Sequence, residues 1–131
     1  MEKGAQALVY EEKQNLPGYF PAIKVKNTRK ALSFLSNRFY NHPSSNLIVI
    51  GVTGTDGKSS TVYYIHQLLE MLGKPAGFLS TVQFKTNKKI DKNPYRQSTP
   101  ESPEIQSILR QMADNKKEFA VIEATSHGLS Q

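Results

Sequence analysis

The stretch that decides the fold reads "LIVIGVTGTDGKSS" and covers residues 47–60. Residues 47–52 are apolar or glycine without polar alternation, which is typical of a strand buried on both faces of a parallel sheet. Two more glycines and a lysine follow, and apolar residues then recur at helical spacing, with Gly73 as a helix terminator. These apolar residues are Val62, Ile65, Leu68, Leu69 and Leu72. A strand, a glycine turn and a helix, in this order, form a phosphate-binding βα unit.

The glycine turn carries the residue types that hold a nucleotide. Glycines let the backbone turn tightly, so that several N–H groups point at phosphate oxygens. A lysine reaches the β and γ phosphates, and the next hydroxyl binds Mg²⁺. Gly54, Gly57, Lys58 and Ser59 fill these roles in order, although Val52 stands where the usual Walker A string has its first glycine. The alternative is a glycine-rich turn with an incidental lysine, and the flanking strand and helix favour the phosphate loop.

Upstream of the loop, the sequence predicts a smaller α/β unit. Residues 5–10 and 22–25 are β-prone, and residues 28–40 have helical periodicity with Thr28 as a candidate cap. The helix face is formed by Ala31, Leu32, Leu35 and Phe39. Residues 41–46, "NHPSSN", have the composition of a linker or domain boundary.

Downstream, strands and helices continue to alternate. Residues 76–84 are predicted to form a second strand, and residues 119–124 a third. Between them, Thr99 or Ser102 is expected to cap a helix. The buried face of this helix is predicted to be Ile105, Ile108, Leu109 and Met112. The alternation predicts a mostly parallel, doubly wound α/β sheet, which binds ligands at the carboxyl ends of its strands.

Two further residues are candidates for chemistry. Glu123 ends the third predicted strand, where a carboxylate beside a phosphate loop can hold a metal ion on the nucleotide. A solvated or capping glutamate is the alternative. His127 could act as a general acid or base, as a hydrogen-bond donor to substrate, or as a structural residue. His42 and His66 have no suggestive neighbours, and no paired-histidine zinc spacing exists.

Composition narrows the class of protein. The 131 residues carry a net charge of +6, so anionic partners are expected. Basic residues are spread along the chain, and their densest group, at 85–96, belongs to no recognisable nucleic-acid module, which favours a phosphorylated small molecule over nucleic acid. The absence of cysteine and of an apolar run of about 20 residues predicts a cytoplasmic protein without membrane insertion. The oligomeric state is open, and a monomer is expected.

Three segments together resemble one family. "GVTGTDGKSST", "STPE" and "IEATSHGLSQ" closely resemble the Mur ligases, and among them the UDP-N-acetylmuramoyl-tripeptide synthetases. That family's loop, G-x-T-G-T-N-G-K-T-T, accounts for the shifted first glycine. Here Asp56 replaces asparagine, serines replace threonines at 59 and 60, and Thr125 replaces serine. Asp56 adds a negative charge that should weaken ATP binding unless it points outward or meets a cation.

The resemblance implies a domain organisation and roles for individual residues. Residues 1–45 would end a UDP-substrate-binding domain, and residues 46–131 would begin the central ATP-binding domain. A C-terminal domain would be absent, so the chain is expected to be a fragment that is inactive alone. ATP and Mg²⁺ are the implied cofactors. The implied ATP-binding residues are Gly54, Thr55, Asp56, Gly57, Lys58, Ser59 and Ser60. The implied catalytic residues are Lys58 and Glu123, and the implied metal ligands are Ser59 and Glu123. The implied substrate-binding residues are Gln97, Ser98, Thr99, Thr125 and Gln131.

The implied activity is an ATP-dependent ligation. ATP would phosphorylate the terminal carboxylate of UDP-N-acetylmuramoyl-L-alanyl-D-glutamate, and an amino acid would displace phosphate from the acyl phosphate to form an amide. A folylpolyglutamate or cyanophycin synthetase would use the same loop, and a small-molecule kinase would usually carry its loop nearer the start of the chain. A non-catalytic nucleotide-binding module remains the alternative from another class. The identity of the third amino acid is not encoded in these residues.

Overall fold

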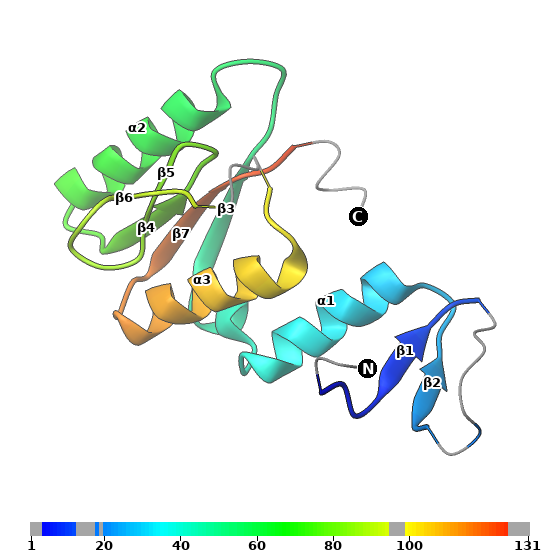
Figure 1. Ribbon diagram of the computed structural model, residues 1–131. Helices are drawn as coiled ribbons and strands as arrows, with labels where there is room; N and C mark the ends of the chain where they lie inside the picture. Colours follow the sequence, from blue (N-terminus) through cyan, green and yellow to red (C-terminus); the bar gives the residue numbers. More distant parts are fainter. Residues whose placement is uncertain (1–3, 13–17, 19, 95–98, 126–131) are drawn as a thin grey trace.

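The computed structural model describes residues 4–12, 18, 20–94 and 99–125, which form one five-stranded sheet, a separate pair of strands and three α-helices (Figure 1). None of the helices in these described ranges is long and apolar enough to cross a membrane. In chain order the elements are β1 (Leu8–Tyr10), β2 (Ala22–Lys24), α1 (Thr28–Phe39), the 3₁₀ helix η1 (Pro43–Asn46), β3 (Ile48–Val52), α2 (Lys58–Met71), β4 (Ala76–Leu79), β5 (Gln83–Lys85), β6 (Asp91–Lys92), α3 (Ser102–Asp114) and β7 (Phe119–Glu123).

The five-stranded sheet has the order β3-β7-β4-β5-β6. Strand β7 runs parallel to both of its neighbours, β3 and β4, whereas β5 and β6 extend the sheet in antiparallel fashion. This confirms a mixed α/β fold with a parallel core. Because Val52 pairs with Glu123, the carboxyl ends of β3 and β7 lie side by side at the same end of the sheet.

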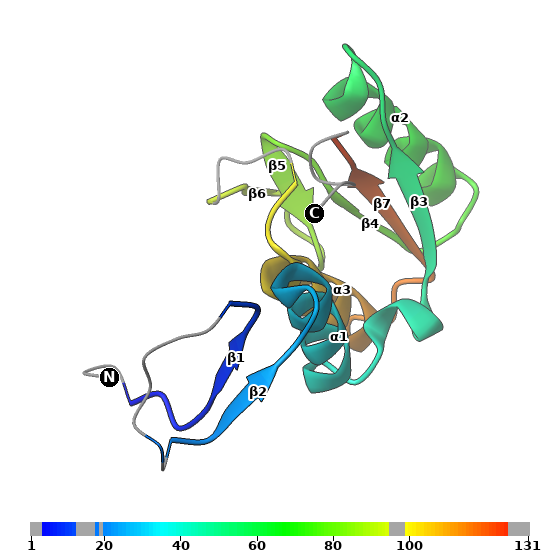
Figure 2. The same ribbon diagram turned by 90° about the vertical axis from the view of Figure 1, so that its right-hand side faces the viewer.

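Helices cover both faces of the sheet (Figures 1 and 2). Successive residues of a strand point to opposite faces, so Leu79 and Ile122 pack with α3 while Phe78 and Val121 pack with α2. The predicted apolar face of α3 is confirmed, since Ile108, Leu109 and Met112 are all buried there.

Helix α3 packs closely against the sheet at Gly77 of β4. A Cβ atom at this position would lie 2.7 Å from Met112 Sδ and 2.8 Å from the Lys85 carbonyl oxygen. Both separations are shorter than a carbon atom tolerates. The absence of a side chain at Gly77 therefore permits the close contact with Met112 of α3.

The expectation that residues 47–52 are buried on both faces is wrong. Strand β3 lies at an edge of the sheet, and Ile48 and Val49 remain 58% and 43% exposed. The predicted apolar face of α1 is exposed at Leu32, Leu35 and Phe39, and the buried residue of this helix is Ser36. In α2 the predicted stripe is likewise incomplete, with Leu68 and Leu72 exposed.

Three local predictions also need correction. Residues 76–84 form two strands, because the Ser80 backbone N–H and hydroxyl both donate to the Gln83 carbonyl oxygen and turn the chain back. The N-cap of α1 is Asn27, whose side chain accepts from the Lys30 N–H, so Thr28 is not the cap. The N-cap of α3 is Glu101, so neither Thr99 nor Ser102 has that position; Ser102 is the first helical residue.

Residues 41–46 are folded rather than an extended linker. They contain η1, whose Pro43 is buried, and η1 contacts α3. Helix α1 also contacts α3, and the β1–β2 pair lies beyond α1, apart from the larger sheet in both views (Figures 1 and 2).

Candidate functional site

The glycine loop joins the end of β3 to the start of α2. Gly57 precedes the helix with a φ of +74°, a left-handed conformation that glycine adopts without steric cost. Its carbonyl oxygen accepts hydrogen bonds from the Thr61 N–H at 2.9 Å and from the Thr61 hydroxyl at 3.0 Å. The first N–H groups of an α-helix have no partner within the helix, and they carry its partial positive charge. The loop therefore presents an end of α2 that favours anions.

Lys58 lies at this helix end with its side chain folded over the loop. Its ammonium group donates to the carbonyl oxygens of Gly54 and Thr55, each at 2.9 Å. Both acceptors belong to exposed residues. The positive charge is thus held above the turn by contacts that a stronger anionic acceptor could replace.

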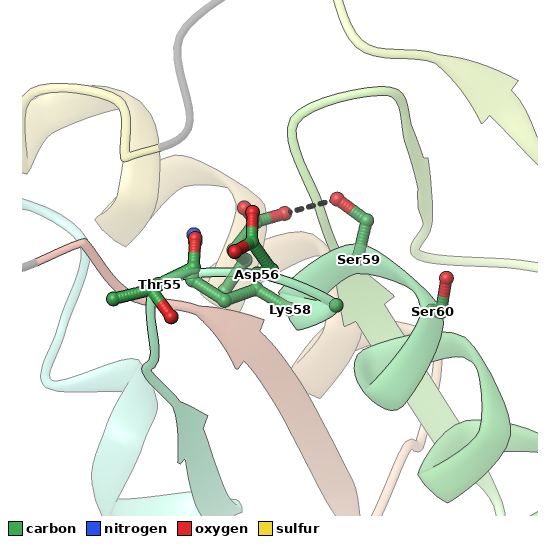
Figure 3. Close-up of a pocket in the computed structure, with 7 residues that line it drawn as sticks. Thr55, Asp56, Lys58, Ser59 and Ser60 are labelled. Carbon is green, nitrogen blue, oxygen red and sulfur yellow. Dashed lines mark hydrogen bonds between the residues drawn. The ribbon is translucent and has the colours of Figure 1, made fainter.

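Glu123 brings the end of β7 to the same place. The Ser59 hydroxyl donates to Glu123 Oε2 at 2.7 Å, the contact drawn as a dashed line in Figure 3. The Thr81 backbone N–H donates to the same oxygen at 2.9 Å. Glu123 is only 2% exposed, and a buried carboxylate of this kind needs such donors. The sequence-based pairing of the loop with Glu123 is therefore present in the folded chain.

These groups line an open hollow at the carboxyl end of β7. Its lining consists of Thr55, Asp56, Gly57, Lys58, Ser59, Ser60 and Glu123 (Figure 3). Gly54 is next to this lining, and its carbonyl oxygen is bonded by Lys58. Asp56 is exposed, so solvent weakens the repulsion between its negative charge and an anion in the hollow.

Two of the predicted substrate residues meet beside the end of β7. The hydroxyls of Thr99 and Thr125 lie 3.1 Å apart, and the Thr125 N–H donates to Thr99 Oγ1 at 3.0 Å. Gln97, Ser98, His127 and Gln131 lie outside the described residues. Sequence reasoning missed Thr81, because it contributes a backbone N–H and no side-chain type signals such a contact.

The other two histidines lie away from the hollow. His66 is buried in α2 against Tyr63 and Phe78. Burial lowers its pKa below the ordinary 6.5, and the positive charge of Lys85 lowers it further. Neither ring nitrogen of His66 has a hydrogen-bond partner among the described residues. His42 contacts the Asn37 amide at 3.1 Å and belongs to the turn before η1.

Oxygen atoms dominate the candidate site. Within the described ranges, no group of three or more His, Cys, Asp or Glu side chains could hold a metal ion. Ser59 and Glu123 instead form an oxygen pair at the base of the loop. Hard cations such as Mg²⁺ accept a few protein oxygens together with phosphate and water.

The Mur ligase middle domain matches residues 52–131, which is more than half of the sequence and includes the loop and Glu123. The chain belongs to the Mur ligase family. The Mur ligase match begins at Val52, the last residue of β3.

Similar proteins carry names from the same family. A UDP-N-acetylmuramyl-tripeptide synthetase of Borreliella afzelii is 56% identical over 135 residues, covering 98% of this chain and 26% of that protein. The synthetase of Roseiflexus sp. is 46% identical over 133 residues, covering 99% of this chain and 26% of that protein. A UDP-N-acetylmuramoyl-L-alanyl-D-glutamate–2,6-diaminopimelate ligase of Clostridium perfringens is 35% identical, covering 98% of this chain and 26% of that protein.

A solved structure supports the fold. It is a UDP-N-acetylmuramoyl-L-alanyl-D-glutamate–2,6-diaminopimelate ligase, which aligns with a TM-score of 0.77 over 98% of this chain and 26% of its own, at 24% identity. The chain thus spans about a quarter of the length of these Mur ligases.

Proposed function

We propose that this chain contains the nucleotide site of an ATP-dependent ligase of peptidoglycan precursor synthesis, which adds the third amino acid to UDP-N-acetylmuramoyl-L-alanyl-D-glutamate. The observation that carries the proposal is the contact between Ser59 and Glu123 under the glycine loop. Family membership and the names of the similar proteins support the ligase class and the muramoyl substrate.

The loop would bind the phosphates of ATP. Backbone N–H groups from Gly54 to Ser60 would face phosphate oxygens at the positive end of α2. Lys58 would exchange its two carbonyl contacts for the terminal phosphates. A phosphate carries full negative charge, which makes it the stronger acceptor for an ammonium group.

Ser59 and Glu123 are suited to hold Mg²⁺. Their contacting oxygens lie 2.7 Å apart. Neighbouring ligands of an octahedral Mg²⁺ with bonds of about 2.0–2.1 Å are separated by about 2.9 Å. The pair therefore fits two adjacent coordination positions with little movement. When bound, the ion would neutralise charge on the transferring phosphoryl group.

The protein residues would contribute mainly by positioning. A carboxylate is a poor electrophile, and its phosphorylation supplies a leaving group that an incoming amine can displace. Lys58 would hold the γ-phosphate in line with the substrate carboxylate, and Glu123 would fix the metal beside it. Thr99 and Thr125, which already contact each other, would bind the muramoyl peptide. Gln97, Ser98 and Gln131 are proposed for the same role.

We also propose a domain assignment. Residues 1–45 would form the end of a UDP-substrate-binding domain, and residues 46–131 would form the first part of the ATP-binding domain. The division between a two-stranded and a five-stranded sheet supports this proposal.

The test is phosphate release by the complete gene product with MgATP, the UDP-muramoyl dipeptide and one candidate amino acid per reaction. We expect release that requires both the dipeptide and a single amine. Lys58→Ala should lower the rate by at least about 100-fold. Lys74→Ala, which removes an exposed lysine after the opposite end of α2, serves as the matched control and should retain the rate.

Other outcomes point to the alternatives. Release with a different acid substrate would indicate a sister ligase of the folylpolyglutamate or cyanophycin type. Magnesium-dependent ATP binding without release in any reaction would indicate a non-catalytic nucleotide-binding protein. Full activity of Lys58→Ala would refute the assignment of the loop.

A further inference from the structure

The loop between β4 and β5 takes part in orienting Glu123. Thr81, in the middle of this loop, donates its backbone N–H to Glu123 Oε2 at 2.9 Å. The same oxygen accepts the Ser59 hydroxyl. A hydroxyl can rotate toward a new partner, whereas a backbone N–H is fixed by the path of the chain. The orientation of the carboxylate therefore depends on how firmly residues 80–82 are held.

Asn93 holds this loop on both sides of Thr81. Its side-chain Nδ2 donates to the Ser80 carbonyl oxygen at 2.8 Å, and its backbone N–H donates to the Val82 carbonyl oxygen at 2.9 Å. Asn93 is 7% exposed and Ser80 is 4% exposed, so the contact between the Asn93 amide and the Ser80 carbonyl oxygen is buried. Interior hydrogen bonds are costly to break, because the groups left behind find no water.

The contact from Asn93 reaches the site across the antiparallel part of the sheet. Asn93 directly follows β6, and β6 pairs with β5 at Gln83 and Phe84. The hairpin of β5 and β6 therefore carries Asn93 back to the carboxyl end of β4. No side chain of this hairpin lines the hollow at the glycine loop.

We propose that Asn93 is a positioning residue for the metal-binding carboxylate. By fixing residues 80–82, it keeps the Thr81 N–H directed at Glu123, and so holds that carboxylate in the orientation that binds Mg²⁺. This inference rests on the proposed function, in which Glu123 holds the ion. Carboxylate ligands are commonly oriented by outer hydrogen bonds, and loss of such a bond typically lowers metal affinity by about 10- to 100-fold.

The first test follows amide hydrogen exchange by NMR in the protein without nucleotide. Asn93→Ala removes the side-chain contact with Ser80 and should accelerate exchange of the Thr81 amide at least tenfold. Exchange of the Val121 amide, in the central strand β7, should stay unchanged. The matched control is Asn87→Ala in the same hairpin, because Asn87 accepts from the Lys89 N–H in an exposed turn and should affect neither amide.

The second test measures binding of Mn²⁺ in the presence of ATP by electron paramagnetic resonance. We expect Asn93→Ala to weaken Mn²⁺ binding by about 10- to 100-fold, and Asn87→Ala to leave it unchanged. If Asn93→Ala does not fold, Asn93→Ser replaces it, since serine keeps a short polar side chain without the reach of the amide.

The outcomes separate the two proposals. Unchanged Thr81 exchange in the variant would overturn the positioning role, and so would uniform acceleration of all amides. Faster Thr81 exchange with native Mn²⁺ affinity would overturn it as well. If the unsubstituted protein binds no Mn²⁺ with ATP, the proposed function fails and the inference falls with it, whatever the exchange data show.

Discussion

Glu70, near the end of α2, joins three parts of the chain, and its removal tests the electrostatics of the fold. Its Oε1 accepts from the Ala76 N–H at 3.0 Å and lies 3.4 Å from Lys117 Nζ, and its Oε2 accepts from Lys85 Nζ at 3.0 Å. Both lysine side chains are only 12% exposed. Glu70→Gln keeps an acceptor for Ala76 but leaves two poorly solvated ammonium groups without their carboxylate.

The magnitude follows from the pKa of Glu70. Burial raises this pKa, but the Ala76 N–H and the two lysines outweigh burial and lower it from 4.5 to about 2. Full linkage would correspond to about 3.4 kcal/mol of folding free energy. Solvent reaches 35% of the Glu70 side chain, and screening reduces the expected contribution to about 1–2 kcal/mol.

The sign of the pH dependence is fixed by the direction of this change. A carboxyl group with a lowered pKa in the folded state stabilises the protein above its unfolded value. That stabilisation is lost as the pH falls from about 4.5 toward 2. Glu70→Gln should therefore lower the free energy of unfolding at pH 7 by about 1–2 kcal/mol and flatten its dependence on pH below 4.5.

The assay is urea unfolding between pH 2 and pH 7. Glu118→Gln is the control, because Glu118 lies 4.0 Å from Lys74 with both side chains more than half exposed. Such a pair contributes little, and the control should lose less than about 0.5 kcal/mol. An acid slope in Glu70→Gln that matches the unsubstituted protein would refute the reasoning.

Three further substitutions test other parts of the structure. Gly77→Ala places a methyl group 2.7 Å from Met112 Sδ and should cost about 1–3 kcal/mol in urea unfolding, so a loss below about 0.5 kcal/mol would contradict the close packing. Burial lowers the pKa of His66 in the fold, so the unfolded chain binds the proton more readily and stability should decline as the pH falls below 6.5. His66→Leu should reduce this decline, measured by thermal unfolding at pH 7.5 and 5.5, and an unchanged decline would contradict the burial effect. Ser59→Ala should raise the Mg²⁺ concentration needed for ATP binding, measured by calorimetry, whereas Ser59→Thr should not; equal effects would argue against a metal-binding hydroxyl.

The parts of the site that sequence predicts best are those that follow from the geometry of parallel strands. If the strand before the glycine loop and the strand ending in Glu123 are parallel neighbours, their carboxyl ends bring the loop and Glu123 together. Strands β3 and β7 are such neighbours. The periodicity of α3 was equally informative, because its apolar residues Ile108, Leu109 and Met112 pack together against one face of the sheet.

The missed features depend on contacts that a local pattern does not contain. The edge position of β3 follows from the order of strands, which the run of apolar residues at 47–52 does not encode. The division of residues 76–84 comes from a turn closed by the Ser80 side chain. Thr81 contributes only a backbone N–H, and the residues on either side of it are bonded by Asn93, twelve residues later. Composition and spacing carry no signal for these three features.

The central position of β7 has a consequence for folding during synthesis on the ribosome. Strands β3 and β4 are made first, but in the sheet they are separated by β7, which ends 44 residues after β4 (123 minus 79). Until β7 emerges, two apolar strands expose unpaired edges that can join the wrong partner. Ser59 and Glu123 are 64 residues apart, so the candidate magnesium site cannot exist before this last strand is inserted. Nucleotide binding at this site would therefore stabilise the fold only after β7 has paired with β3 and β4, and would not guide the earlier steps of folding.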